Sequence, residues 1–342
     1  MKIVVIGGTG NIGTAVIERL RGNELVGVCR RLPDREPPYD GAEWHHIDVS
    51  TPESSDLLVR VLADADAVVH AAWAIQPSHD PEYLHRVNVE GSRRVIDAVV
   101  NAKVPHLVYL SSVGAYSPAR DSTRIDENWP TDGVSTSGYS RDKSEVERIL
   151  DGVQAARPEL TVTRLRPGLV LQRRSASEVA RYFLGPLAPR LLFKAAEKRL
   201  IPVVPLPRSL TLQFVHAMDV ADAVAAAVVR RYDGPVNLAA EPPLSADAVA
   251  ELVGRRLLPT SDRVLRPLAA VSWRAHLQPT PPGWLDLAMG SPVLDTDLAR
   301  RELGWQPKLD AGATLRDLVG GLADNAGVSA SPALRPGTHK RP

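Results

Sequence analysis

Residues 1–13 read MKIVVIGGTGNIG, and this stretch decides the fold of the chain. Ile3 to Ile6 is an unbroken apolar run rich in β-branched residues, which suits a strand buried on both faces of a parallel sheet. Glycines follow at every third position from residue 7 to residue 13, and helix formers continue to residue 20. This order of strand, glycine turn and helix cradles a pyrophosphate, because the first N–H groups of the helix are free and carry partial positive charge. The alternative interpretation is an ordinary strand-to-helix turn.

The composition excludes several classes of protein. A chain of 342 residues with 44% apolar content can form one large α/β domain and a smaller lobe. Its net charge of +1, with scattered basic residues, gives no reason to expect a nucleic-acid partner. The single cysteine, Cys29, cannot form an internal disulfide, which favours a reducing compartment. Since no signal peptide and no membrane-spanning run is evident, we expect a soluble cytoplasmic protein without a membrane partner.

Strands and helices alternate along most of the chain. Apolar runs predict strands at 25–29, 44–49, 66–72, 106–112, 161–165 and 236–239. Helical spacing predicts helices at 53–63, 83–102, 139–150, 219–230, 245–258, 295–303 and 313–323. This alternation is typical of βαβ units. We therefore predict an α/β fold, a Rossmann-type doubly wound parallel sheet with a smaller, mainly C-terminal α/β substrate lobe.

The end of the second predicted strand bears on the choice of cofactor. Dinucleotide folds place a carboxylate there to bind the adenosine ribose 2′-hydroxyl. Here Arg30 and Arg31 follow Cys29, and no carboxylate occurs before Asp34. Since paired guanidinium groups suit a 2′-phosphate, we favour NADP(H), with NAD(H) as the other possibility. The alternative interpretation is that both arginines are solvated loop charges.

Two further patterns indicate a catalytic site. Ser111 and Ser112 end a central predicted strand, and ligands of open α/β sheets bind beyond the carboxyl ends of the strands. Tyr139 and Lys143 are four residues apart at the start of a predicted helix, so they share one helix face. A nearby ammonium favours the phenolate form of a tyrosine, so Lys143 is expected to lower the pKa of Tyr139. The alternative is a surface tyrosine–lysine pair on an amphipathic helix.

Taken together, the motifs resemble those of the extended short-chain dehydrogenases/reductases, in the group called the NAD-dependent epimerase/dehydratase family. The matching segments are residues 7–13, 48–49, 70–72, 88–91, 111–116, Tyr139-x-x-x-Lys143, 166–168, 214–221 and 303–307. They cover most of the chain in the family's order. The motifs are specific to the superfamily and much less specific to a substrate.

The resemblance implies a role for each matching residue. Tyr139 would exchange a proton with the substrate oxygen, and Lys143 would also hold the nicotinamide ribose. Ser112 would orient the substrate oxygen; it is preferred to Ser111 because it lies four residues before Tyr116. Asn88 would link Lys143 to solvent, unless it is only a helix-packing residue. The implied cofactor-binding residues are Gly7, Thr9, Gly10, Asn11, Ile12, Gly13, Arg30, Arg31, Asp48, Val49, Ala71, Ala72, Asn88, Tyr139, Lys143 and Pro167.

Departures from the family pattern narrow the reaction. Val113 and Gly114 stand where sugar-nucleotide dehydratases carry an Asp-Glu pair, so dehydration of that type is not expected. Gln213 precedes Phe214 where nucleotide-sugar epimerases usually carry an arginine near this segment, although Arg208 lies upstream. With an apolar lobe, this favours a small or lipophilic carbonyl or alcohol. Candidate substrate-binding residues are Trp73, Ser112, Tyr182 and Phe183, with Ile75 and Phe193 as further apolar candidates.

We predict an NAD(P)-binding Rossmann domain over residues 1–167, with 212–235 packing back on it. The substrate lobe would comprise residues 168–211 and 236–323, and residues 324–342 would form a disordered tail. The first hypothesis is an NADP-dependent carbonyl reductase or alcohol dehydrogenase. The alternatives are a nucleotide-sugar epimerase that retains NAD and a non-catalytic NAD(P)-sensing module. The family analogy allows a homodimer. No metal site is predicted.

Overall fold

The computed structural model describes residues 1–75, 80–119, 123–184, 190–276 and 280–336. Its main element is a seven-stranded sheet in which every pair of neighbouring strands is parallel. The strand order is β12 (Gly234–Leu238), β7 (Thr161–Pro167), β5 (His106–Leu110), β4 (Ala67–His70), β1 (Lys2–Ile6), β2 (Glu24–Cys29) and β3 (Ala42–His46). The order reverses on either side of β1, as in a doubly wound sheet. The predicted Rossmann-type fold is confirmed.

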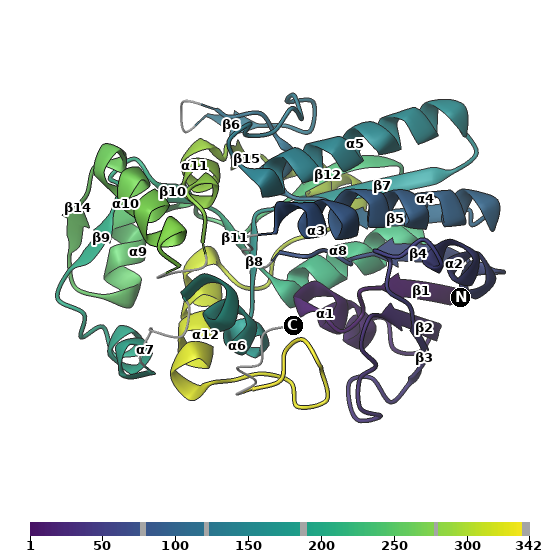
Figure 1. Cartoon of the computed structure of the whole chain (residues 1–342), viewed down its shortest axis with the longest axis horizontal. Helices are drawn as coiled ribbons and strands as arrows, with labels where there is room; N and C mark the ends of the chain where they lie inside the picture. Colours follow the sequence, from purple (N-terminus) through teal and green to yellow (C-terminus); the bar gives the residue numbers. More distant parts are fainter. Residues whose placement is uncertain (76–79, 120–122, 185–189, 277–279, 337–342) are drawn as a thin grey trace.

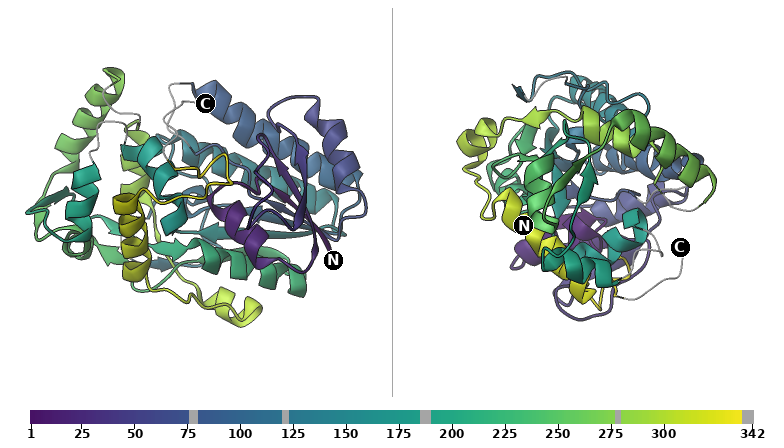
Figure 2. Two further views of the ribbon diagram at one scale, coloured as in Figure 1. Left: turned by 90° about the horizontal axis from the view of Figure 1, so that it is seen from below. Right: turned by 90° about the vertical axis from the view of Figure 1, so that its left-hand side faces the viewer.

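Helices cover both faces of the sheet (Figures 1 and 2). Ile3 and Val5 of β1 face a core shared with α1 (Asn11–Arg19) and α8 (Ala217–Arg230). The alternate residues Val4 and Ile6 face the opposite core. The helices of that face are α2 (Ser54–Leu62), α4 (Gly91–Asn101) and α5 (Gly138–Ala156). Burial on both faces explains why β1 is a continuous apolar run.

The long helix predicted over residues 83–102 is divided in the structure. α3 (Pro81–His85) leads into a π-helical turn, η1 (Arg86–Glu90), and α4 follows directly. Asn88 lies in this turn, where its backbone carbonyl accepts a hydrogen bond from the Ser92 hydroxyl at 2.5 Å. The predicted helical stretch is therefore continuous, but it contains a π-helical turn that the sequence did not indicate. π-Helical turns often occur at functional sites, and this one carries a predicted site residue.

The smaller lobe contains short two-stranded sheets and several helices (Figure 1, left). The strand pairs are β10 (Thr211–Leu212) with β13 (Leu244–Ser245), β11 (Phe214–His216) with β8 (Leu169–Leu171), β14 (Leu257–Pro259) with β9 (Val204–Leu206), and β15 (Val293–Leu294) with β6 (Arg124–Ile125). The helices are α6 (Ala176–Val179), η4 (Ala180–Leu184), α7 (Arg190–Glu197), α9 (Ala246–Val253), α10 (Asp262–Arg274), α11 (Gly283–Gly290), η5 (Ala299–Leu303) and α12 (Ala311–Asp324). A short 3₁₀ turn, η3 (Arg173–Ser175), precedes α6, and another, η2 (Val113–Ala115), follows β5 of the large sheet. α9 and α12 contribute to the core of this lobe.

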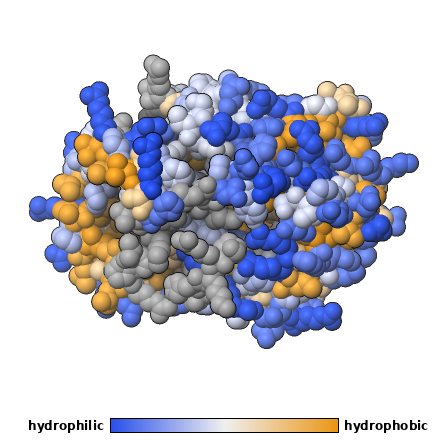
Figure 3. All heavy atoms as spheres, viewed as in Figure 1, coloured by the Kyte–Doolittle hydropathy of each residue, from blue (hydrophilic) through white to orange (hydrophobic). Residues whose placement is uncertain are grey.

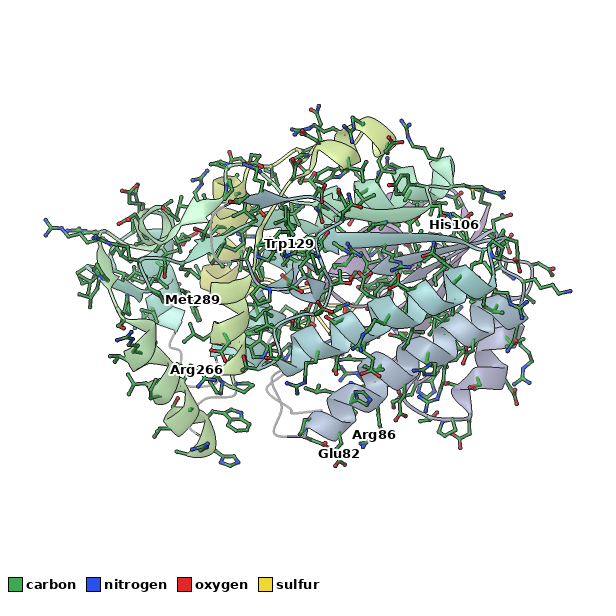
Figure 4. All side chains as sticks on the ribbon, turned by 90° about the horizontal axis from the view of Figure 1, so that it is seen from above. Glu82, Arg86, His106, Trp129, Arg266 and Met289 are labelled. Carbon is green, nitrogen blue, oxygen red and sulfur yellow. The ribbon has the colours of Figure 1, made fainter. Side chains whose placement is uncertain are left out.

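Residues 172–211 and 259–292 look irregular in the sequence, and the structure corrects that expectation. In the second region, α10 carries Pro267 inside the helix, and α11 begins directly after Pro282. Proline is tolerated at a helix start because the first N–H groups have no intrahelical partner. Arg266 pairs with Asp286 at 2.8 Å and joins the two helices (Figure 4). Prolines in this region did not mark loops, because one lies inside α10 and another directly precedes α11.

The predicted disordered tail is wrong for residues 325–336, which pack against the Rossmann domain. Val328, Ala330 and Leu334 join the core shared with α1 and α8, and Leu334 is fully buried. The buried residues lie among small and polar ones, so the composition of the segment resembles that of a linker and indicated disorder. Residues 337–342 of that tail lie outside the described residues.

The surface of the smaller lobe is comparatively apolar. Most exposed large hydrophobic side chains of the described residues come from it: Leu191, Leu192, Leu200, Val203, Leu258, Val264, Leu268 and Val271. Apolar patches are visible at that end of the molecule, and others lie at the opposite end (Figure 3). In the described part of the chain, no helix has the length and apolar character that crossing a membrane requires.

Candidate active site

The glycine turn between β1 and α1 has the geometry that a pyrophosphate needs. Gly7 has a φ of +85°, and a Cβ there would lie 2.5 Å from the Ala72 nitrogen. A Cβ on Gly13 would lie 2.1 Å from the Gly7 oxygen, so only glycine lets α1 approach the strand this closely. A Cβ on Gly10 would meet only the Gly7 oxygen, at 3.6 Å. Since no side chain of the described residues caps α1, its first N–H groups are left for a ligand.

A cavity of about 160 Å³ extends from this turn along the ends of β2 and β4. Most of the predicted cofactor-binding residues line it: Gly7, Thr9, Gly10, Arg30, Arg31, Asp48, Val49, Ala71 and Ala72. The other predicted residues are not on its wall in the described part of the chain: Asn11, Ile12, Gly13, Asn88, Tyr139, Lys143 and Pro167. Asn11 is instead bonded to the lobe connection, through Val170 and Gln172. Nine of the predicted residues thus lie along one cavity, and their role in binding a cofactor stays a prediction.

Part of the cavity wall comes from residues that sequence reasoning missed. Glu178 of α6, together with Pro332 and Ala333, lines it. Burial raises the pKa of Glu178 to about 7. Tyr182, predicted as a substrate residue, also lies on this cavity. No motif marks these positions, because only the tertiary fold brings them to the nucleotide-binding turn.

The residues after β2 surround the same cavity. Arg30 donates a hydrogen bond to the Tyr83 hydroxyl, and both side chains line the cavity. Cys29 is buried, with its sulfur 3.0 Å from the Arg31 carbonyl oxygen. Burial raises the pKa of the Cys29 thiol to about 11, so it is a poor nucleophile near neutral pH.

Tyr139 lies in a group of aromatic rings at the start of α5. Its ring centroid is 5.9 Å from that of Trp73 and 5.0 Å from that of Trp284. Phe183 packs edge-on against Trp284 at 5.1 Å. A Cβ on Gly114 would lie 2.8 Å from Tyr139 Cε1, so this glycine allows the tyrosine ring to contact the turn after Ser112. The structure therefore places the predicted Trp73 and Phe183 around the same aromatic group.

Trp284 was absent from the predicted site residues. It reaches Tyr139 because α11 packs closely on the loop before α5. A Cβ on Gly283 would lie 2.5 Å from the Thr136 oxygen, which shows how tight this contact is. The Gly283-Trp284 pair is visible in the sequence and could have indicated a close contact, but it lies in a segment that looked irregular.

The pKa of Tyr139 differs from the sequence expectation. Burial raises it to about 12, and only a hydrogen bond with the Ser112 side chain opposes the rise. Lys143 was expected to lower it. Instead the Lys143 amine donates to the Leu110 carbonyl at 2.7 Å and lies 3.5 Å from the centroid of the Trp73 ring. The ammonium is thus directed at a carbonyl and an aromatic face rather than at the phenol.

Lys143 itself is buried in a polar and aromatic environment. Burial lowers its pKa well below the usual value, and the carboxylates of Glu147 and Asp142 oppose that shift. Its amine also donates to the Tyr109 hydroxyl at 3.3 Å. A buried lysine with a lowered pKa is typical of functional sites, and this one contacts Trp73 of the cavity wall.

The two candidate serines have different partners. Ser112 caps the 3₁₀ turn η2, accepting a hydrogen bond from the Gly114 N–H at 3.0 Å. Ser111 donates to Glu147 at 2.5 Å. Glu147 is fully buried and also binds Arg164 and Arg166. Ser111 therefore belongs to a buried polar network under α5, while Ser112 faces Tyr139.

Asn88 holds the loop that carries Trp73. Its side chain accepts from the Ala74 N–H at 2.7 Å and donates to the Ala74 carbonyl at 3.2 Å. Its amide also donates to Asp142 at 3.3 Å, one residue before Lys143. Asn88 thus connects the π-helical turn, the Trp73 loop and α5.

The residues present fit a nicotinamide dinucleotide. The open cradle above Gly10 suits the pyrophosphate, and the cavity continues from it toward Arg30 and Arg31. On the other side, Trp73 lines the cavity and also contacts Tyr139. The Trp73 indole N–H is buried and has no hydrogen-bond partner among the described residues, as expected for a donor reserved for a ligand. For metals, the described residues contain no group of three or more ligating side chains.

The family model that matches the chain covers most of this architecture. It is the NAD dependent epimerase/dehydratase family, and it matches residues 3–239. The chain belongs to this family. The match runs from β1 to the residue after β12 and so includes the glycine turn and the Ser112, Tyr139 and Lys143 positions of this epimerase/dehydratase-family chain.

Three curated relatives of this family member differ in length and activity. A dTDP-6-deoxy-L-talose 4-dehydrogenase of Kitasatospora kifunensis is 28% identical over 93% of this chain and 94% of its own length. A sterol-4-alpha-carboxylate 3-dehydrogenase of Saccharomyces cerevisiae is 27% identical over 48% of this chain and 50% of its own length. An uncharacterized protein of Mycobacterium tuberculosis is 24% identical over 93% of this chain, which spans only 30% of that relative's length.

Solved structures share the fold of this family member. The UDP-glucose 4-epimerase of Thermotoga maritima has a TM-score of 0.70, with 17% identity over 95% of this chain and 99% of that one. A dTDP-glucose 4,6-dehydratase of Streptomyces venezuelae also has a TM-score of 0.70, with 17% identity over 95% of this chain and 98% of that one. At this identity the likeness concerns the fold alone.

Proposed function

We propose that the chain is an NADP(H)-dependent carbonyl reductase or alcohol dehydrogenase with Ser112, Tyr139 and Lys143 as its catalytic residues. The observation that carries the proposal is the position of Tyr139, between Trp73 and Trp284 and beside Ser112. With a pKa of about 12, the phenol keeps its proton at neutral pH. A protonated tyrosine in an apolar pocket is suited to donate a proton to a carbonyl oxygen. The arrangement therefore favours reduction.

Each residue has a chemical task in this proposal. When bound, the nicotinamide supplies or takes up the hydride. Tyr139 donates the proton to the substrate oxygen, and Ser112 hydrogen-bonds that oxygen and orients it. Lys143, whose amine lies 3.5 Å from the centroid of the Trp73 ring, would hold the nicotinamide ribose. The aromatic rings of Trp73, Trp284 and Phe183 exclude water and bind an apolar substrate.

Gln213 supports a substrate other than a nucleotide sugar. Its side chain is buried, and its oxygen accepts a hydrogen bond from the Leu294 N–H at 2.6 Å. Its amide donates to the Leu294 carbonyl at 3.2 Å. Gln213 thus fixes β15 through both polar atoms, and a neutral amide replaces the arginine that would hold a diphosphate. Arg208 is exposed.

The second candidate is a nucleotide-sugar dehydrogenase or epimerase. It is favoured by the relative of Kitasatospora kifunensis, a dTDP-sugar dehydrogenase that matches nearly the whole chain. Calorimetric titration of the cofactor-stripped protein with NADPH, NADH, UDP and dTDP separates the two. We expect NADPH to bind more tightly than NADH and neither UDP nor dTDP to bind. Tight UDP or dTDP binding, or cofactor that cannot be stripped, would favour the second candidate.

Tyr139→Phe tests the mechanism. Loss of the proton donor should lower kcat for reduction of an aromatic ketone or aldehyde by about 10² to 10⁴-fold. The Kd for NADPH should change little, because the ring and its packing remain. Tyr232→Phe is the matched control, since Tyr232 lies just before the start of β12 and its hydroxyl donates to the Pro235 carbonyl, at 3.4 Å. Full turnover by Tyr139→Phe would exclude the proposed role.

A further inference from the structure

The residues that follow α12 form an ordered segment, 326–335, that returns from the smaller lobe to the Rossmann domain. The Val328 N–H donates to the Leu334 carbonyl at 3.0 Å, which closes the segment into a compact loop. Ser177 of α6 binds this loop through its hydroxyl, which donates to the Leu334 carbonyl at 2.9 Å. With Val328, Ala330 and Leu334 buried in the sheet's core, the segment has a fixed position.

The segment forms a hydrogen bond to the glycine turn. The Ser331 hydroxyl is fully buried and donates to the Thr9 carbonyl at 2.8 Å. The next carbonyl of the turn, that of Gly10, accepts from the Thr14 hydroxyl at 2.7 Å. Thr14 in turn shares a hydrogen bond of 2.8 Å with the Tyr39 hydroxyl. Two adjacent carbonyl oxygens of the turn therefore accept hydrogen bonds. One donor is Thr14 of α1, and the other is Ser331, 322 positions after Thr9.

The same segment also holds the loop that carries Arg30 and Arg31. The Asp34 N–H donates to the Ala330 carbonyl at 3.0 Å. The Asp34 carboxylate pairs with Arg335 at 2.6 Å. Pro332 and Ala333, between these two anchors, line the cavity itself. The segment thus contacts the glycine turn and the loop after β2, and it forms part of the cavity wall.

We propose that segment 326–335 is a cofactor-positioning element that completes the adenosine end of the site and favours a 2′-phosphate. Ser331 fixes the glycine turn, which both dinucleotides use. Arg335 neutralises Asp34, which lies three positions after Arg31. Without Arg335, the Asp34 carboxylate would compete with a 2′-phosphate for Arg30 and Arg31 and would repel it. This inference rests on the proposed NADP(H) function.

The two residues have different expected signatures in dinucleotide titrations. Ser331→Ala should weaken NADPH and NADH alike, by about threefold to tenfold, because one buried hydrogen bond to the turn is lost. Arg335→Ala should weaken NADPH by about twofold to fivefold at low salt and leave NADH nearly unchanged, since the ion pair is partly exposed. Adding Asp34→Asn to Arg335→Ala should restore the preference for NADPH. A structural role alone would not produce this rescue.

The matched controls are Ser54→Ala and Arg300→Ala. Ser54 is a buried serine whose hydroxyl donates to Thr51 at the start of α2, and Arg300 pairs with Asp297 on the surface. Both should leave the Kd values of the two dinucleotides unchanged. Hydrogen exchange gives a second readout: amides of 326–335 should exchange more slowly when NADPH is bound.

The outcomes separate this inference from the proposed function. If the parent protein binds neither dinucleotide, the proposed function fails. If the parent binds NADPH but Ser331→Ala and Arg335→Ala bind both dinucleotides as the controls do, the proposed function stands and the positioning role is wrong. Equal losses of NADPH and NADH in Arg335→Ala, with no rescue by Asp34→Asn, would leave a role in the fold and overturn the claim about the 2′-phosphate.

Discussion

Single residues decide how closely the backbone of this site can pack, and glycines show it best. The spacing of Gly7, Gly10 and Gly13 predicted the turn, and the structure shows why a glycine occupies each of these three positions. Gly7 has a positive φ, Gly13 touches the preceding strand, and Gly10 leaves open space. These distinctions follow from three-dimensional packing, so the sequence could indicate the motif but not which glycine tolerates a side chain.

Gly13→Ala should destabilise the protein, because its Cβ would meet the Gly7 backbone oxygen at 2.1 Å. We expect a loss of about 2 kcal/mol in the free energy of unfolding, as for overpacking of a tight core. Gly152→Ala is the matched control, because an added Cβ there meets nothing within 4 Å on an exposed face of α5. That change should stabilise by about 0.5–1 kcal/mol, through helix propensity. Urea unfolding measures both, and equal effects would contradict the packing argument.

At the scale of elements, α5 is the most informative helix. Its first turns carry Tyr139 and Lys143, whose spacing was predicted from the sequence. The structure adds Glu147, one turn further along, which is buried and paired with Arg164 and Arg166. Isolated charges in the sequence do not show such pairing, because the two arginines come from β7. The aromatic group around Tyr139 was missed in part for the same reason, since Trp284 comes from a segment that looked irregular.

Glu147→Gln should loosen α5 from the sheet. It removes the carboxylate that Arg166 pairs with and leaves Arg164 only its pair with Asp151 among the described residues, so we expect a loss of about 3–5 kcal/mol in unfolding free energy. Asp151→Asn is the control on the same helix, because Asp151 also pairs with Arg164 but is largely exposed; its cost should be below about 1 kcal/mol. The pKa of Glu147 is lowered by Arg166 and Arg164 against the effect of burial. Its contribution is therefore present above the unfolded pKa and is lost as the pH falls through the folded pKa.

At the scale of the whole molecule, buried histidines make stability depend on pH. Burial lowers the pKa of His70 to about 3, with help from the charge of Lys143. Burial also lowers the pKa of His106 to about 4 (labelled in Figure 4). Below a pH of about 6.5 the unfolded chain takes up a proton at each histidine while the folded chain does not. Stability is then greatest near neutral pH and falls on acidification.

As the pH falls from about 6 toward the folded pKa of a buried histidine, that histidine should lower the free energy of unfolding by up to about 1.4 kcal/mol per pH unit. Urea unfolding at several pH values from 7.5 down to about 5 measures this slope. His106→Gln should reduce the slope toward the contribution of His70 alone. His46→Gln changes an exposed histidine of the same sheet and is the matched control. An unchanged slope in His106→Gln would contradict the assignment.

The overall architecture was largely predictable, because local apolar runs in the sequence indicate the alternating strands and helices of the Rossmann domain. The smaller lobe was less predictable, because its short strands and proline-bearing helices depend on contacts between distant segments. The segment 326–335 was missed for a related reason. Its buried residues are few and lie among serines, prolines and alanines, so composition resembled a linker.

The contact between Ser331 and Thr9 also orders events during synthesis. A ribosome makes the glycine turn first and makes its partner serine 322 residues later. At about 5–20 residues per second, the turn emerges tens of seconds before the residue that supports it. The Rossmann domain can therefore assemble its sheet early, but its nucleotide site reaches its final form only after the smaller lobe has been translated and has folded back.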